Sequence, residues 1–127
     1  MLLYITLGTN DLARARRFYD PVLATLGLEC RSADDSDIGY AGHGDSRCRL
    51  WVTRPFDGRP ATIGNGSMVA LDASSRAAVD AFYRAGLEQG GTDEGAPGLR
   101  PYSPHFYACY LRDPDGNKLS AVCETPE

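Results

Sequence analysis

Residues 4–27 read YITLGTNDLARARRFYDPVLATLG, and residues 68–91 read MVALDASSRAAVDAFYRAGLEQGG. When the sequence is shifted by 64 positions, so that residue 4 falls on residue 68, an apolar stretch falls on an apolar stretch. The same shift aligns a Phe-Tyr pair with a Phe-Tyr pair and a glycine with a glycine. Such matches at one constant offset are hard to obtain by chance in a short chain. The sequence therefore predicts two copies of a unit of about 60 residues.

A strand and then a helix are expected at the start of each copy. Alternation with a period of two predicts strands at about residues 2–8 and 67–72. Apolar side chains at spacings of three and four predict helices over residues 12–26 and 76–89. Polar residues that can cap a helix precede both, and glycines that accept a left-handed conformation follow both. Pro21 is expected to kink the first helix or to end it early.

Strand-like segments separated by turn residues follow each helix. In the first copy they span residues 28–33, 37–42 and 48–53, and in the second they begin poorly defined near Thr92 and continue over 106–112 and 118–123. Gly95–Pro104, with its three prolines and two glycines, is expected to be a loop. Each copy is therefore βαβββ.

This pattern predicts an α+β fold that forms one domain from two modules. We place module one at residues 1–54, a linker at 55–63 and module two at 64–127. A chain of 127 residues has the length of one ordinary domain.

Both ends of the chain resemble the vicinal oxygen chelate superfamily, which contains glyoxalase I, the bleomycin-resistance proteins and the extradiol dioxygenases. The motifs that carry the resemblance are residues 4–12, YITLGTNDL, and residues 106–117, FYACYLRDPDGN, with Phe18-Tyr19 between them. The resemblance covers essentially the whole chain. It implies that the two modules form a cupped mixed sheet with a central cleft, which in this superfamily is often completed in a homodimer.

The resemblance also assigns positions to the family's metal ligands. The metal enzymes carry a histidine on the first strand of each module and a glutamate on the last strand, and these positions here hold Tyr4, Met68 and Ser120. A fourth ligand position falls near Leu50 or Trp51. Period-two alternation directs Tyr4, Met68 and Ser120 toward the cleft. Zn²⁺, Ni²⁺ and Mn²⁺ prefer imidazole and carboxylate, so we expect no metal and no cofactor.

The residues expected to bind a ligand in the cleft are Tyr4, Trp51, Met68, His105, Tyr110 and Ser120. Tyr4 and Trp51 have the character of pocket walls, although the same side chains could instead fill an empty cleft. Met68 either lines the pocket or simply packs there. His105, where the expected loop meets a strand, is a candidate hydrogen-bond donor or general base, or an ordinary surface histidine.

Other polar groups have structural explanations. His43 is expected in a hairpin turn, and the DPDG sequence of residues 113–116 has the composition of a reverse turn. Cys109 and His105 are four residues apart on a strand, about 13 Å, too far to act as a nucleophile and its base. The four cysteines have no CxxC spacing and are expected to be free thiols.

Charge and hydropathy limit the partners. The net charge of −4 disfavours a nucleic-acid binder. No stretch approaches the ~20 apolar residues of a membrane helix, and the apolar N-terminus has no basic flank like that of a signal peptide. We therefore expect a cytoplasmic protein with no membrane and no nucleic-acid partner.

Two classes of function fit these observations. The first is a binding protein that holds a small organic molecule in the cleft without the family's usual metal, as bleomycin-resistance proteins do. The alternative is a superfamily enzyme (a lyase, isomerase or dioxygenase) that acts metal-free, with Tyr4 or His105 transferring a proton, or with an atypical metal site. A third is an inert relative with a collapsed cleft. The expected partners are an unidentified small molecule and a second copy of the chain.

Overall fold

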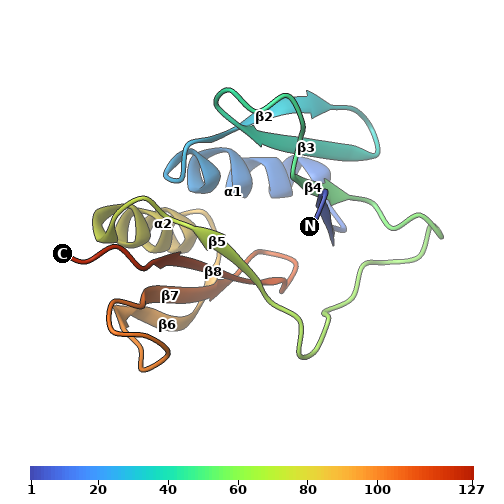
Figure 1. Cartoon of the computed structure of the whole chain (residues 1–127). Helices are drawn as coiled ribbons and strands as arrows, with labels where there is room; N and C mark the ends of the chain where they lie inside the picture. The colour runs from blue at the N-terminus through green and yellow to red at the C-terminus, as the bar shows by residue number, and fades with distance from the viewer.

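Both expected repeats are present, and they keep the offset of 64 positions through their first three elements (Figure 1). The computed structural model describes residues 1–127. The first copy comprises β1 (Ile5–Gly8), α1 (Leu12–Ala24), β2 (Leu28–Ala33), β3 (Asp37–Gly42) and β4 (Leu50–Thr53). The second comprises β5 (Val69–Asp72), α2 (Arg76–Glu88), β6 (Thr92–Leu99), β7 (Tyr107–Arg112) and β8 (Lys118–Cys123). The fold is α+β and consists of two βαβββ modules.

Each module builds one mixed sheet of four strands. The orders are β1-β4-β3-β2 and β5-β8-β7-β6, so the two sheets have the same topology. The first strand of each module pairs in parallel with the last, and the other pairings are antiparallel. The first sheet packs against α1, the second packs against α2, and the two helices lie side by side (Figure 1).

The helices begin at the expected caps. The Asp11 carboxylate accepts a hydrogen bond from the Arg14 N–H at 2.9 Å, and the Ser75 hydroxyl accepts one from the Ala78 N–H at 3.0 Å. Pro21 does not end the first helix, because α1 continues to Ala24. Fully buried side chains on both sides of the proline, such as Phe18 and Val22, hold the helix against the core.

The expected loop Gly95–Pro104 is shorter than the sequence suggested. Its first five residues belong to β6, which ends at Leu99 and pairs with β7 through two shifts of register. Strand β6 lies at the edge of its sheet, where a proline such as Pro97 removes no hydrogen bond from the ladder. Only residues 100–106 remain as the connection between β6 and β7.

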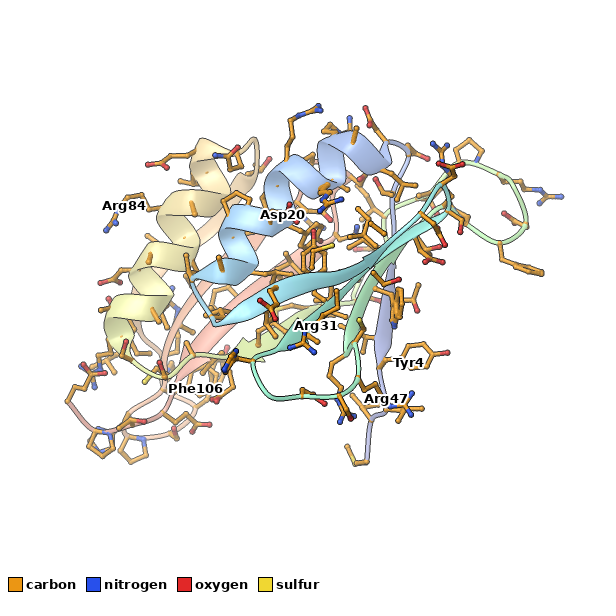
Figure 2. The ribbon with its side chains drawn as sticks, turned by 90° about the horizontal axis from the view of Figure 1, so that it is seen from above. Tyr4, Asp20, Arg31, Arg47, Arg84 and Phe106 are labelled. Atoms are coloured by element: carbon orange, nitrogen blue, oxygen red, sulfur yellow. The ribbon has the colours of Figure 1, made fainter.

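The core lies where each sheet meets its helix. Seventeen buried residues from both modules form one cluster, and Ile5 and Leu7 of β1 pack against it. The alternate residues Tyr4 and Thr6 are exposed, as a period of two requires. Figure 2 shows Tyr4 on the side of the first sheet away from the helices. Each sheet therefore has a core face and an open face. Neither helix is long and apolar enough to cross a membrane.

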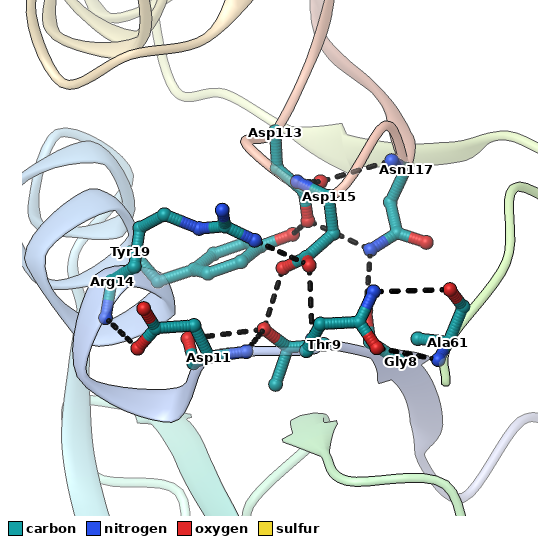
Figure 3. Close-up of polar contacts among 10 residues, drawn as sticks. Gly8, Thr9, Asp11, Arg14, Tyr19, Ala61, Asp113, Asp115 and Asn117 are labelled. Carbon is teal, nitrogen blue, oxygen red and sulfur yellow. Dashed lines mark hydrogen bonds and ion pairs between the residues drawn. The ribbon is translucent and has the colours of Figure 1, made fainter. Parts of the chain in front are cut away.

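The turn between β7 and β8, residues 113–117, joins the modules and is called the joint turn below (Figure 3). The Asp115 carboxylate accepts hydrogen bonds from the Thr9 hydroxyl at 2.5 Å, the Asn10 N–H at 2.9 Å and the Arg14 guanidinium at 2.7 Å. The Asn117 amide donates to the carbonyl of Gly8 at 2.9 Å. The expected reverse turn is confirmed by the bond from the Gly116 N–H to the Asp113 carbonyl, and it also fixes one module on the other.

Candidate functional site

A hollow of about 1020 Å³ opens on the open face of the first sheet. Tyr4 and Thr6 from the start of the chain and Trp51 and Thr53 of β4 line it, because alternate residues of a strand share one face. The rest of the lining comes from the segments that flank β3 and β4, and it includes Ser36, Asp37, Ser46, Arg47, Arg54 and Phe56. This hollow, called the first hollow below, is of the size that drug-sized ligands occupy.

The Trp51 indole lies close against β3. A Cβ atom on Gly39 would come within 2.6 Å of Trp51 Cζ3 and 2.8 Å of Cys48 Sγ. Gly39 pairs with Trp51 across β3 and β4, so the missing side chain leaves the space that the ring occupies. The first hollow therefore has a flat aromatic surface on a rigid strand rather than on a loop.

The charged groups around the first hollow are largely free to meet a ligand. Arg54 donates through Nε to the Asp35 carbonyl at 3.0 Å, and neither Arg54 nor Arg47 forms an ion pair. Asp37 lines the same hollow, and its carboxylate accepts a long hydrogen bond of 3.4 Å from the Ser36 hydroxyl. The hollow thus combines aromatic walls with polar groups of both signs.

The open face of the second sheet carries three more of the expected residues. Ser120 of β8 lies directly opposite Tyr110 of β7 on one side and Ala70 of β5 on the other. Met68, which precedes β5, is 45% exposed. Ser120 is fully buried, yet its hydroxyl has no hydrogen-bond partner. Two cations flank the Tyr110 ring, with Arg100 Cζ 5.4 Å and Lys118 Nζ 5.9 Å from its centre.

The six expected site residues fall into separate groups within one chain. Tyr4 and Trp51 share the first hollow, whereas Met68, Tyr110 and Ser120 do not line it. His105 is half-buried in the connection between β6 and β7, beside Phe106, and Figure 2 shows Phe106 on the opposite side of the molecule from Tyr4. A single chain therefore does not gather the six residues around one ligand.

Several residues at these faces were not anticipated from the sequence. Arg47, Arg54 and Phe56 reach the first hollow from irregular segments, which show no periodicity that could reveal where they point. Lys118 could have been found, since it lies two residues before Ser120 and alternation places both on one face. Arg100 follows β6, in the segment that was expected to be a loop.

The residues at the family's metal positions do not fit a divalent metal. Tyr4, Met68 and Ser120 offer a phenol, a thioether and a hydroxyl, whereas Zn²⁺, Ni²⁺ and Mn²⁺ prefer imidazole and carboxylate. No group of three or more His, Cys, Asp and Glu side chains lies close enough to hold a metal ion. No step of a reaction is therefore assigned to a metal.

The fully buried titratable groups Cys109 and Tyr19 lie in the core, whereas Tyr110 of the open second-sheet face is only partly buried. Burial raises the pKa of the Cys109 thiol to about 11, and the thiol lies 3.8 Å from the carbonyl of Val79. Burial raises the pKa of the Tyr19 phenol as well, with the Asp113 charge adding to the effect. The pKa of Tyr110 is also raised, chiefly by partial burial. Cys109 is therefore a core thiol and not a nucleophile.

The free energy of unfolding is expected to fall as the pH rises from about 9 to about 11. Burial raises the pKa of Cys109 from 9.0 to about 11 and that of Tyr19 well above 10.0. In this window the unfolded chain releases these protons while the folded chain keeps them, so the unfolded state binds fewer protons and gains stability. Cys109 alone accounts for about 2 kcal/mol. Urea unfolding at a series of pH values measures the slope.

A matched pair of variants tests whether Cys109 causes this fall of the free energy of unfolding with pH. Cys109→Ala should show a shallower fall in stability than the unchanged protein, because the buried thiol is absent. Cys30→Ala removes a half-exposed thiol from β2 and should leave the slope unchanged. Equal slopes in all three proteins would show that burial of Cys109 has no part in the pH dependence.

Comparisons with known proteins agree on one family. The family model of the Glyoxalase/Bleomycin resistance protein/Dioxygenase superfamily matches residues 1–120. The chain is similar to the crystal structure of a glyoxalase/bleomycin resistance protein from Albidiferax ferrireducens T118, with 40% identity, a TM-score of 0.86, and coverage of 96% of this chain and 97% of that one. No curated protein sequence matches the chain.

More distant structures show the fold alone. A glyoxalase-related enzyme from Fulvimarina pelagi is 20% identical, with a TM-score of 0.76 and coverage of 97% of this chain and 87% of that one. A lactoylglutathione lyase from Agrobacterium tumefaciens is 21% identical, with a TM-score of 0.67 and coverage of 97% and 92%.

Proposed function

Because the chain belongs to the glyoxalase/bleomycin resistance protein/dioxygenase superfamily, we propose that it binds a small organic molecule in the family's cleft without the usual metal. The observation that carries the proposal is the first hollow, which has aromatic walls and no set of metal ligands. Binding needs only apolar area with a few polar groups that fix the orientation of the ligand.

The state of the aromatic side chains favours a binding site over a collapsed cleft. Tyr4 is 51% exposed and lines the hollow, and Phe56 at its rim is exposed. Had Tyr4 and Trp51 packed together to fill the space, no hollow of about 1020 Å³ would remain beside them. Exposed aromatic surface of this kind is costly unless a ligand or a partner covers it.

The proposal includes a second copy of the chain as the cover of the first hollow. Every residue that lines the hollow belongs to residues 4–56, so the second module of the same chain contributes nothing to it. Large apolar side chains are also exposed on the single chain, among them Leu2, Leu3, Met68 and Leu99. In a homodimer, the open second-sheet face of one copy would cover the first hollow of the other. Tyr4 and Trp51 of one copy would then meet Met68, Tyr110 and Ser120 of its partner.

The chain's only tryptophan is a built-in reporter for the binding test. We expect small aromatic molecules, screened singly, to change the Trp51 emission in a saturable way and to be recovered chemically unchanged. Tyr4→Ala should weaken such binding about tenfold, since it removes one wall of the hollow. Tyr102→Ala, which changes an exposed tyrosine outside the hollow, is the control and should bind normally.

The same preparation tests the other parts of the proposal. Elemental analysis of untagged protein, purified without chelator or nickel resin, should find no stoichiometric metal, and sedimentation should find a dimer. Near-stoichiometric zinc, nickel, manganese or iron would overturn the metal-free site, and conversion of a bound molecule would favour an enzyme. A screen in which nothing alters the Trp51 emission would overturn the binding function.

A further inference from the structure

We propose that the open face of the second sheet carries a subsite for an oxyanion, the carboxylate or phosphate group of a ligand, formed by Arg100, Lys118 and Ser120 around the Tyr110 ring. The inference rests on the proposed function, because it names the chemical class of ligand that the open faces would take. Four independent features of the face support it.

The first feature is a pair of cations that share one aromatic ring. Arg100 and Lys118 both lie within cation–π distance of Tyr110, and neither forms an ion pair. All three residues are half-buried, so water screens their charges less than it screens charges at an exposed surface. Both positive charges attract an anion to the space around this ring, and either cation can donate a charge-assisted hydrogen bond to it.

The second feature is the orphaned hydroxyl of Ser120. The neighbours Leu119 and Ala121 point into the core, so alternation directs Ser120 to the open face, next to Tyr110 in register. The side chain is fully buried and its oxygen has no partner. A buried hydroxyl without a partner costs about 1–3 kcal/mol, and native proteins rarely leave one unexplained. An oxyanion at this face would accept its proton.

The third feature is the room that β6 leaves for the guanidinium. A Cβ atom on Gly95 would come within 3.0 Å of Tyr110 Cδ2 and 3.4 Å of Arg100 Nη2, and one on Gly98 within 2.9 Å of Arg100 Nη1. The carbonyl of Ala96 accepts a hydrogen bond from Arg100 Nη2 at 2.7 Å. The irregular register of β6 and its two glycines thus leave the space in which the Arg100 guanidinium lies beside the Tyr110 ring.

The fourth feature is that the acidic residues of β6 have other partners. Glu94 pairs with Arg112, which lies on the same face as Tyr110. Asp93 accepts hydrogen bonds from the Tyr83 hydroxyl at 2.9 Å and the Gly95 N–H at 2.8 Å. Neither carboxylate neutralises Arg100 or Lys118. Arg100 and Lys118 therefore keep unpaired positive charges beside Tyr110, whereas the acidic residues of the same face, Asp72 and Glu124, lie further along it near Val122.

Titration with inorganic phosphate at low ionic strength tests the subsite directly. The backbone amide signals of Tyr110 and Ser120 in ¹⁵N NMR spectra should move and saturate. Arg100→Gln and Lys118→Gln should each weaken this binding at least about fivefold. Arg84→Gln, which removes an exposed and unpaired cation from α2, is the matched control and should bind as the unchanged protein does (Figure 2). Equal binding by all four proteins, or no saturable shift, would overturn the subsite.

A second measurement separates this inference from the proposed function. Benzoate and benzyl alcohol have the same ring and differ in charge, and both can be followed through Trp51. Tighter binding of benzoate, lost in Lys118→Gln, supports the subsite. Equal binding of the two overturns the anionic ligand and leaves the binding function standing. If neither binds while phosphate still moves the Ser120 signal, the subsite stands and the aromatic hollow loses its support.

Discussion

Replacing Asp113 with alanine is expected to lower the free energy of unfolding by about 4 kcal/mol. Asp113 is only 3% exposed, and its carboxylate accepts hydrogen bonds from the Tyr19 hydroxyl, from the N–H groups of Asp115 and Asn117, and from the Asn117 amide. The substitution leaves all four donors without their acceptor, and the Tyr19 hydroxyl is buried in the core where water cannot replace it. The joint turn loses its internal hydrogen bonds and its bond to Tyr19 of α1 together, and only the bond from Arg14 to Asp115 still ties it to that helix.

Urea unfolding at neutral pH measures this effect. Asp35→Ala changes an exposed aspartate near β3 and should alter stability by less than about 0.5 kcal/mol. Tyr19→Phe removes one of the four donors and should cost about 1–2 kcal/mol. Because the two side chains bond directly, the losses in the double variant should not add. A loss below about 1 kcal/mol in Asp113→Ala would mean that the turn does not hold the modules together.

Gly91→Ala is expected to cost about 3 kcal/mol for a different reason. A Cβ atom on Gly91 would lie 2.7 Å from the carbonyl oxygen of Gly86, 2.8 Å from that of Arg112 and 3.0 Å from the Phe18 ring. Two of these neighbours are backbone atoms, which cannot move aside without displacing α2 and β7. Gly91, three residues beyond the end of α2, is therefore a glycine because a side chain has no space there.

Thermal unfolding of Gly91→Ala and Gly42→Ala compares a crowded glycine with an open one. A Cβ atom on Gly42 would meet nothing closer than Leu28 Cδ2 at 3.9 Å, so this control should keep its melting temperature within a few degrees. Gly91→Ala should melt at least about 10 °C lower. Similar melting temperatures would show that the chain relaxes around the added methyl group.

The repeat was the most informative signal in the sequence because it combined local periodicity with a constant offset. It correctly placed the first strand and the helix of each module, and alternation correctly separated Ile5 and Leu7 from Tyr4 and Thr6. It could not distinguish the roles of the aligned glycines. Gly27 has a φ of 78° and open space around it, whereas Gly91 is needed for close packing.

Contacts between distant segments explain what the sequence did not reveal. The sequence explained Asp115 as a turn residue and gave no reason to look for a further role. Its hydrogen bond with Thr9 joins positions far apart in the chain, which local sequence patterns do not reveal. The prolines of residues 95–104 suggested a loop because proline is disfavoured in a central strand. Strand β6 lies at the edge of its sheet, where proline is tolerated. The lining of the first hollow depends on the positions of irregular segments in space. Because these segments have no periodicity, the sequence did not indicate that Arg47 and Arg54 line the hollow.

The joint turn also removes the internal symmetry that a duplicated chain would otherwise possess. By the offset of 64 positions, Thr9 corresponds to Ala73 and Arg14 to Ala78, neither of which can repeat the bond to a carboxylate. The side-chain hydrogen bonds between the two modules all involve residues 113–117. The polar contacts between the modules are thus confined to one end, whereas the shared apolar core and the packing of α1 on α2 hold them together elsewhere. Because apolar packing is not directional, any small movement of one module against the other is expected to leave the joint turn in place and to be taken up along the packed helices.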